Sequence, residues 1–137
     1  MNGKSILLDT HIALWYLNGD PKLSEKARSY IDDWENNIYF SVVSMWEIEI
    51  KHILHPDRMI SSGSDVLTRC EKADFTLLPL HPDHIKLLHT LNRAENTPPH
   101  NDPFDRMLIC QAKAEDMLFI TNDGLIPDYN EPCIVSV

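Results

Sequence analysis

The sequence predicts an α/β domain built on a mainly parallel sheet. Short apolar runs with strand character alternate along the chain with longer segments of helical period, and this alternation is typical of parallel sheets. Five runs are expected to form strands, at residues 5–8, 38–41, 76–80, 117–121 and 133–137. Because Pro79 has no backbone N–H to donate, we expect the third strand to lie at a sheet edge or to end early.

Segments of helical period separate the strand candidates. They cover residues 10–17, 24–35, 44–54, 64–73, 82–91 and 103–115. Ser44 and Glu47 have the Ser-x-x-Glu spacing of a capping box at the start of the third segment. Asp102 and Pro103 suit the N-cap and first position of the last one. We therefore expect two helices in each of the three connections that join the first four strands.

Length and composition predict one domain over residues 1–137, with 43% apolar residues. No apolar run reaches the length of a membrane span, and the N-terminus lacks a cleavable signal pattern, so we expect a cytoplasmic protein with no membrane partner. The three cysteines are odd in number and widely spaced. This favours buried thiols over a disulfide framework or a zinc site.

The net charge of −9 argues against a protein that binds nucleic acid through a broad basic surface. It does not exclude an enzyme whose acidic pocket holds metal ions, because a bound cation inverts the local field.

Four acidic residues are predicted to meet at one edge of the sheet. Asp9 follows the first strand, Glu47 lies in the first turn of the next helix, Asp105 begins the helix before the fourth strand, and Asp123 follows that strand. In a parallel sheet these positions gather at the carboxyl edge, where ligands bind. Each residue alone also fits a structural role as a helix cap, a helix-start acid, a partner of Lys51, or a turn residue.

Taken together, four carboxylates in one pocket repel one another and would take up protons unless a cation offset their charge. Hard oxygen ligands without a cysteine or a pair of histidines indicate Mg²⁺ or Mn²⁺. Such a site suits phosphoryl chemistry, in which a metal ion activates water and stabilises the leaving oxygen.

Four segments resemble the PIN-domain ribonucleases, and specifically the VapC-like toxins of bacterial type II toxin–antitoxin systems. They are LLDTHIALWYL at 7–17, SVVSMWEIEIKH at 41–52, HNDPFDRMLICQA at 100–112 and LFITNDGLIPDY at 118–129. The resemblance covers nearly the whole chain and implies a three-layer α/β/α domain.

By this resemblance, Asp9, Glu47, Asp105 and Asp123 match the four acidic metal-site positions of the family. Flanking polar positions that hold or orient those ligands are matched by Asp102, Thr10, Ser44 and Thr121. The implied activity is metal-dependent endonucleolytic cleavage of RNA that leaves 5′-phosphate and 3′-hydroxyl ends. The implied partners are a second copy of the chain and a small antitoxin protein, with DNA bound only through the antitoxin.

Several other residues have two interpretations. Arg106 and Lys51 are candidate RNA contacts, although Arg106 is equally suited to pair with a nearby carboxylate. His100 is expected to be a solvated loop residue near the crevice. The tryptophans are expected in the core or in a dimer contact rather than as base-stacking platforms.

Two other functions remain open from the residues alone. Asp9 could accept a phosphoryl group, as in an aspartyl-phosphate phosphatase or a receiver-like domain. The acidic edge could also serve a non-catalytic module that binds a basic partner.

Overall fold

The computed structural model describes residues 3–137, and these form a parallel five-stranded sheet with the strand order β3-β2-β1-β4-β5. The strands are β1 (Ser5–Leu8), β2 (Asn37–Ser41), β3 (Thr76–Leu78), β4 (Leu118–Thr121) and β5 (Ile134–Ser136). The predicted α/β fold with about five mainly parallel strands is confirmed. β1 lies at the centre of the sheet, so its residues are covered on both faces.

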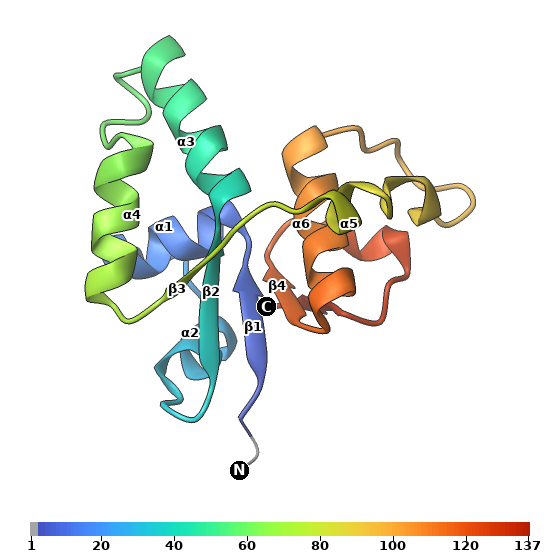
Figure 1. Cartoon of the computed structure of the whole chain (residues 1–137), viewed down its shortest axis with the longest axis horizontal. Helices are drawn as coiled ribbons and strands as arrows, with labels where there is room; N and C mark the ends of the chain where they lie inside the picture. Colours follow the sequence, from blue (N-terminus) through green and yellow to red (C-terminus); the bar gives the residue numbers. More distant parts are fainter. Residues whose placement is uncertain (1–2) are drawn as a thin grey trace.

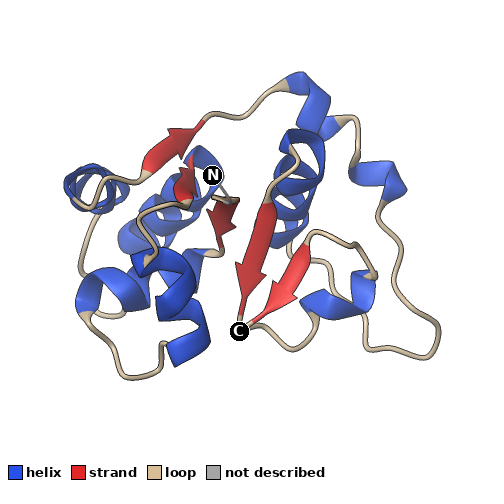
Figure 2. Cartoon of the chain, turned by 90° about the horizontal axis from the view of Figure 1, so that it is seen from below, coloured by secondary structure: helices blue, strands red, loops and turns tan. Residues whose placement is uncertain are grey.

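Two groups of helices enclose the sheet (Figures 1 and 2). One face packs against α1 (Thr10–Asn18), α2 (Glu25–Asp32), α3 (Val42–Leu54) and α4 (Gly63–Lys72). The other face packs against α5 (Pro82–Ile85), α6 (Pro103–Glu115) and the 3₁₀ turns η1 (Leu88–Thr90) and η2 (Ile126–Tyr129).

Side-chain alternation along the strands produces these two cores. Ile6 and Leu8 of β1 point into the first core, and Leu7 points into the second. In β4, Ile120 points into the first core and Phe119 into the second. Successive strand residues face opposite sides of a sheet, and a strand covered on both sides is therefore apolar throughout. The resulting architecture has three layers, α/β/α.

One predicted boundary was confirmed and two were wrong, each for a local reason. β3 is an edge strand that ends at Leu78, directly before Pro79, as the proline predicted. The segment 82–91 does not form one helix but divides into α5 and η1. α3 begins at Val42, because Ser41 is its N-cap and accepts a hydrogen bond from the backbone N–H of Val43. The predicted capping box between Ser44 and Glu47 is therefore wrong.

The tryptophan and cysteine predictions had mixed outcomes. Trp34 and Trp46 are 89% and 59% exposed, so neither belongs to the core. Cys70 and Cys110 are buried thiols as predicted, and Cys133 is half-buried. Among residues 3–137, no helix has the length and apolar character needed to cross a membrane.

The strand order creates a crevice at the carboxyl edge of the sheet. The chain moves outward from β1 through β2 to β3, and then returns to place β4 on the other side of β1. At such a reversal the connections after two adjacent strands leave in opposite directions, and ligands bind in the gap between them. Asp9 follows β1 and Asp123 follows β4, so both lie beside this gap.

Candidate active site

Asp9 is a buried carboxylate held by two threonines. It is 5% exposed and caps α1, with Oδ1 accepting the backbone N–H of Thr10 at 2.8 Å. Oδ2 accepts the hydroxyl of Thr121, at the end of β4, at 2.6 Å. Burial raises the pKa of Asp9 above its ordinary value, although both hydrogen bonds oppose this rise. The side chain is thus fixed at the junction of β1 and β4.

Glu47 projects from α3 and is 4% exposed. The Thr10 hydroxyl donates to its Oε1 at 2.8 Å, and the Lys51 ammonium donates to its Oε2 at 2.7 Å. Ser44 Oγ lies 2.8 Å from Thr10 Oγ1. Since the single hydroxyl hydrogen of Thr10 is given to Glu47, Ser44 is the donor of that second bond. Thr10 therefore connects α1 to the predicted ligand on α3.

Asp105 lies in the first turn of α6 and is held there by Asp102. One oxygen of Asp102 accepts the backbone N–H groups of Phe104 and Asp105, as the sequence predicted for an N-cap. The pKa of Asp105 is raised to about 8, first because its carboxyl is desolvated and then because Asp9, Asp102, Glu47 and Asp123 are nearby negative charges. The other three predicted acids are therefore close enough to act on Asp105, and Glu47 also acts on Asp9.

Asp123 follows β4 in a turn. Its backbone N–H donates to Thr121 Oγ1 at 3.1 Å, and its Oδ1 accepts the backbone N–H of Leu125 at 2.8 Å. Thr121 thus contacts both acids that flank the crevice. A cleft of about 210 Å³ opens here, lined by Asp9, His11, Trp15, Asn122 and Asp123.

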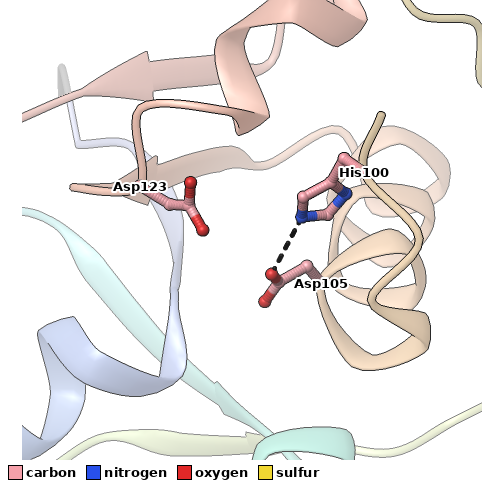
Figure 3. Close-up of side chains that lie close together, drawn as sticks. All are labelled: His100, Asp105 and Asp123. Atoms are coloured by element: carbon pink, nitrogen blue, oxygen red, sulfur yellow. Dashed lines mark hydrogen bonds and ion pairs between the residues drawn. The ribbon is translucent and has the colours of Figure 1, made fainter. Parts of the chain in front are cut away.

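His100 belongs to the same site, contrary to the prediction of a solvated loop histidine. It is 7% exposed, and its Nε2 lies 3.1 Å from Oδ2 of Asp105. Figure 3 shows this contact and the Asp123 carboxylate opposite it. Ligand atoms of His100, Asp105 and Asp123 lie within 4.8 Å of one another.

One feature of the sequence pointed to His100, its position just before the start of α6. The decisive contact was not visible there, because the ring is buried against Tyr129, which lies 29 residues further along the chain.

The donor set fits a divalent cation. Carboxylate oxygens dominate it, and the pKa of Asp105 is raised first by desolvation and then by the neighbouring negative charges, which a bound cation would offset. Asp105 and Asp123, with His100, present a compact group of ligand atoms. The carboxylates of Asp9 and Glu47 accept hydrogen bonds from Thr121 and Thr10, which fix their positions beside that group.

A family model described as PIN domain matches residues 6–131. The chain belongs to the PIN domain family. The resemblance seen in the sequence is thereby confirmed at the level of the family. None of the curated proteins compared with the chain matches it significantly.

Solved structures share this PIN fold at low sequence identity. VapBC2 from Rickettsia felis, bound to a DNA fragment from its promoter, has a TM-score of 0.64 and 14% identity, with 97% of each chain covered. FitAcB from Neisseria gonorrhoeae has a TM-score of 0.63 and 17% identity, covering 94% of this chain and 95% of that one. A toxin–antitoxin complex from Klebsiella pneumoniae has a TM-score of 0.59 and 16% identity, with 95% of each chain covered.

The two basic residues predicted to contact RNA form hydrogen bonds to other residues of this PIN domain. Lys51 pairs with Glu47 and is partly exposed. The guanidinium of Arg106 donates to the Tyr129 hydroxyl at 3.3 Å and to the Leu88 carbonyl at 3.4 Å, so its partners are not carboxylates. Their contact with RNA stays a prediction.

Proposed function

We propose that this PIN domain is a metal-dependent endoribonuclease and acts as the toxin of a type II toxin–antitoxin pair. The observation that carries the proposal is the meeting of Asp9, Glu47, Asp105 and Asp123 at the carboxyl edge of the sheet. These acids come from four distant segments, and the pKa of Asp105 is raised to about 8 by desolvation of its carboxyl and then by the negative charges of its acidic neighbours.

The residues divide into ligands and groups that hold them. Asp105 and Asp123 hold Mg²⁺ or Mn²⁺, and Asp9 and Glu47 complete the acidic set around it. Asp102 fixes the first turn of α6 so that Asp105 faces the crevice, while Thr10, Ser44 and Thr121 fix Glu47 and Asp9. A divalent ion bound there would supply charge compensation for the scissile phosphate and lower the pKa of the attacking water.

The reaction is hydrolysis of a phosphodiester bond. Water attacks phosphorus, the bond from phosphorus to the 3′-oxygen breaks, and that oxygen takes up a proton. The products carry 5′-phosphate and 3′-hydroxyl ends. Lys51 and Arg106 flank the acidic set and are the candidate contacts to the RNA backbone.

The proposed partners are a small antitoxin and a second copy of this chain, with DNA contacted only through the antitoxin. The similar folds in VapBC2 and in the Klebsiella pneumoniae toxin–antitoxin complex support the antitoxin as a partner.

The test is cleavage of end-labelled RNA by the purified protein with Mg²⁺, with Mn²⁺, and with EDTA. We expect cleavage with either metal and none with EDTA. Asp105→Asn removes a ligand charge and should reduce cleavage at least about 100-fold. Asp83→Asn is the matched control, because Asp83 is an exposed acid at the start of α5.

Undiminished cleavage by Asp105→Asn, or cleavage that persists in EDTA, contradicts the proposal. Mapping of the product ends is an independent check, since 2′,3′-cyclic phosphate ends would indicate attack by the ribose hydroxyl in place of water.

A further inference from the structure

Tyr129 fixes which nitrogen of His100 carries a hydrogen. The Tyr129 hydroxyl donates to the backbone carbonyl of His100 at 2.9 Å. A phenolic hydroxyl has only one hydrogen, so its 2.7 Å contact with Nδ1 of His100 must be a bond donated by the ring. Nδ1 therefore carries a hydrogen, and Nε2 is the nitrogen that is free to bind a metal ion.

The other ring nitrogen, Nε2, points at the acidic set. It lies 3.1 Å from Oδ2 of Asp105. A hydrogen shared by the two atoms accounts for this contact in the metal-free protein, and a bound cation would take the place of that hydrogen. Neighbouring ligand atoms on a six-coordinate cation with bonds of about 2.1 Å lie about 3 Å apart, close to the observed spacing.

We propose that His100 is a protein ligand of the divalent cation, through Nε2, together with carboxylate oxygens of Asp105 and Asp123. This inference rests on the proposed function, because it concerns the same ion. It adds an imidazole nitrogen to a centre that the sequence predicted to contain acidic ligands alone. Since Mg²⁺ prefers oxygen ligands and imidazole suits transition metals, the nitrogen biases the site toward Mn²⁺.

The surroundings of the ring match those of a metal-binding histidine. Such histidines donate their second N–H to a protein oxygen, and this bond fixes both the ring and the tautomer. Here the acceptor is Tyr129, whose ring also packs edge-on against the imidazole at 5.4 Å between centroids. Tyr129 is itself held by the guanidinium of Arg106. Tyr129 and Arg106 are thus positioning residues for His100.

The test is pulsed electron paramagnetic resonance of Mn²⁺ bound to the full chain, which detects nitrogen directly coordinated to the ion. We expect ¹⁴N coupling in the wild type and its loss in His100→Gln. His11→Gln is the matched control, because His11 lines the adjacent cleft beside Asp9. It should keep the coupling.

Affinity gives a second readout. Titration of Mn²⁺ should show at least about a 10-fold loss of affinity in His100→Gln, and the loss should be smaller for Mg²⁺. Circular dichroism establishes that the variant is folded. Should it fail to fold, the wild type and His11→Gln, each containing ¹⁵N-histidine, answer the same question through a change from ¹⁴N to ¹⁵N coupling.

The outcomes separate this inference from the proposed function. Bound Mn²⁺ without nitrogen coupling overturns the role of His100 and makes it a hydrogen-bond partner of Asp105, while the metal-dependent nuclease stands. Coupling that survives in His100→Gln also overturns it. No binding of Mn²⁺ or Mg²⁺ by the wild type overturns both.

Discussion

The hydroxyl of Thr10 donates a buried 2.8 Å hydrogen bond to Glu47, which lies 37 residues further along the chain. Thr10 also accepts a hydrogen bond from Ser44, so one side chain at the start of α1 fixes the acid on α3. Asp9, the neighbour of Thr10, is fixed by Thr121. Hydroxyl groups, rather than basic residues alone, therefore set the positions of the carboxylates.

Thr10→Val keeps the shape of the side chain and removes this hydroxyl. The buried Glu47 then loses a donor, which should lower the free energy of unfolding by about 1–3 kcal/mol. RNA cleavage should also fall at least several-fold, because Glu47 is no longer held. Chemical denaturation and cleavage assays measure both. Thr68→Val is the control, because its hydroxyl bonds to Ser64 on the exposed side of α4. Equal behaviour of the two variants would contradict this role for Thr10.

Asp105→Asn should change how the stability of the metal-free protein depends on pH. The folded-state pKa of about 8 exceeds the ordinary 3.8, so the folded protein holds this proton where the unfolded chain has released it. The resulting stability is fully present below about pH 4 and is lost as pH rises through about 8. The asparagine variant does not incur this loss.

In EDTA, the Tm of Asp105→Asn should therefore match that of the wild type near pH 4 and exceed it at pH 9, by about 3–5 °C for each kcal/mol gained. Added Mn²⁺ should reverse the order, since only the wild type keeps the full ligand set. Asp83→Asn, which alters an exposed acid, should show neither effect. A Tm difference that does not vary with pH would be inconsistent with a buried, neutralised Asp105.

Tyr129→Phe tests the hydrogen bonds that orient His100. Loss of the hydroxyl leaves Nδ1 and the carbonyl of His100 without their partner, so Mn²⁺ affinity should fall about 10-fold. Tyr16→Phe removes a hydroxyl that bonds to Asp32 at the surface and should leave metal affinity unchanged. Calorimetric titration distinguishes the two. An unaltered affinity in Tyr129→Phe would mean that the imidazole is oriented without Tyr129.

Lys51→Gln tests how the ammonium group affects metal binding. Lys51 lies 2.7 Å from Glu47 and adds a positive charge beside the acidic set. Its removal should raise Mn²⁺ affinity about 3- to 10-fold, because an incoming cation no longer meets this charge. Lys86→Gln, which breaks an exposed ion pair with Asp83, should have no effect. Weaker Mn²⁺ binding in Lys51→Gln would show that the ammonium supports the ligand geometry instead. The titration is done without RNA, so a role of Lys51 in RNA contact does not affect the measured Mn²⁺ affinity.

The fold was predictable because strands that are buried on both faces appear in the sequence as short apolar runs. β1 and β4 are largely apolar, and because the strands are parallel the acids that follow them lie at the same edge. The N-cap role of Asp102 was equally visible, since it depends only on local residues.

What the sequence did not predict depends on contacts between distant segments. The start of α3 was misplaced because Ser41 and Ser44 are equally good caps in isolation, and Ser41 is selected by the end of β2. His100 was predicted to be solvated because its burial depends on contact with Tyr129, which lies at the end of η2. No pattern within either segment predicts the contact between His100 and Tyr129.

The central place of β1 has a consequence for biosynthesis. Asp9 directly follows β1, and β1 is flanked on one side by β4. Thr121 is the last residue of β4, and Asp123 follows it in the next turn. A growing polypeptide that has emerged from the ribosome only through α6 has no partner for that side of β1 and lacks the last acid. An incomplete translation product therefore lacks part of the acidic set, which is completed only when the β4 segment docks.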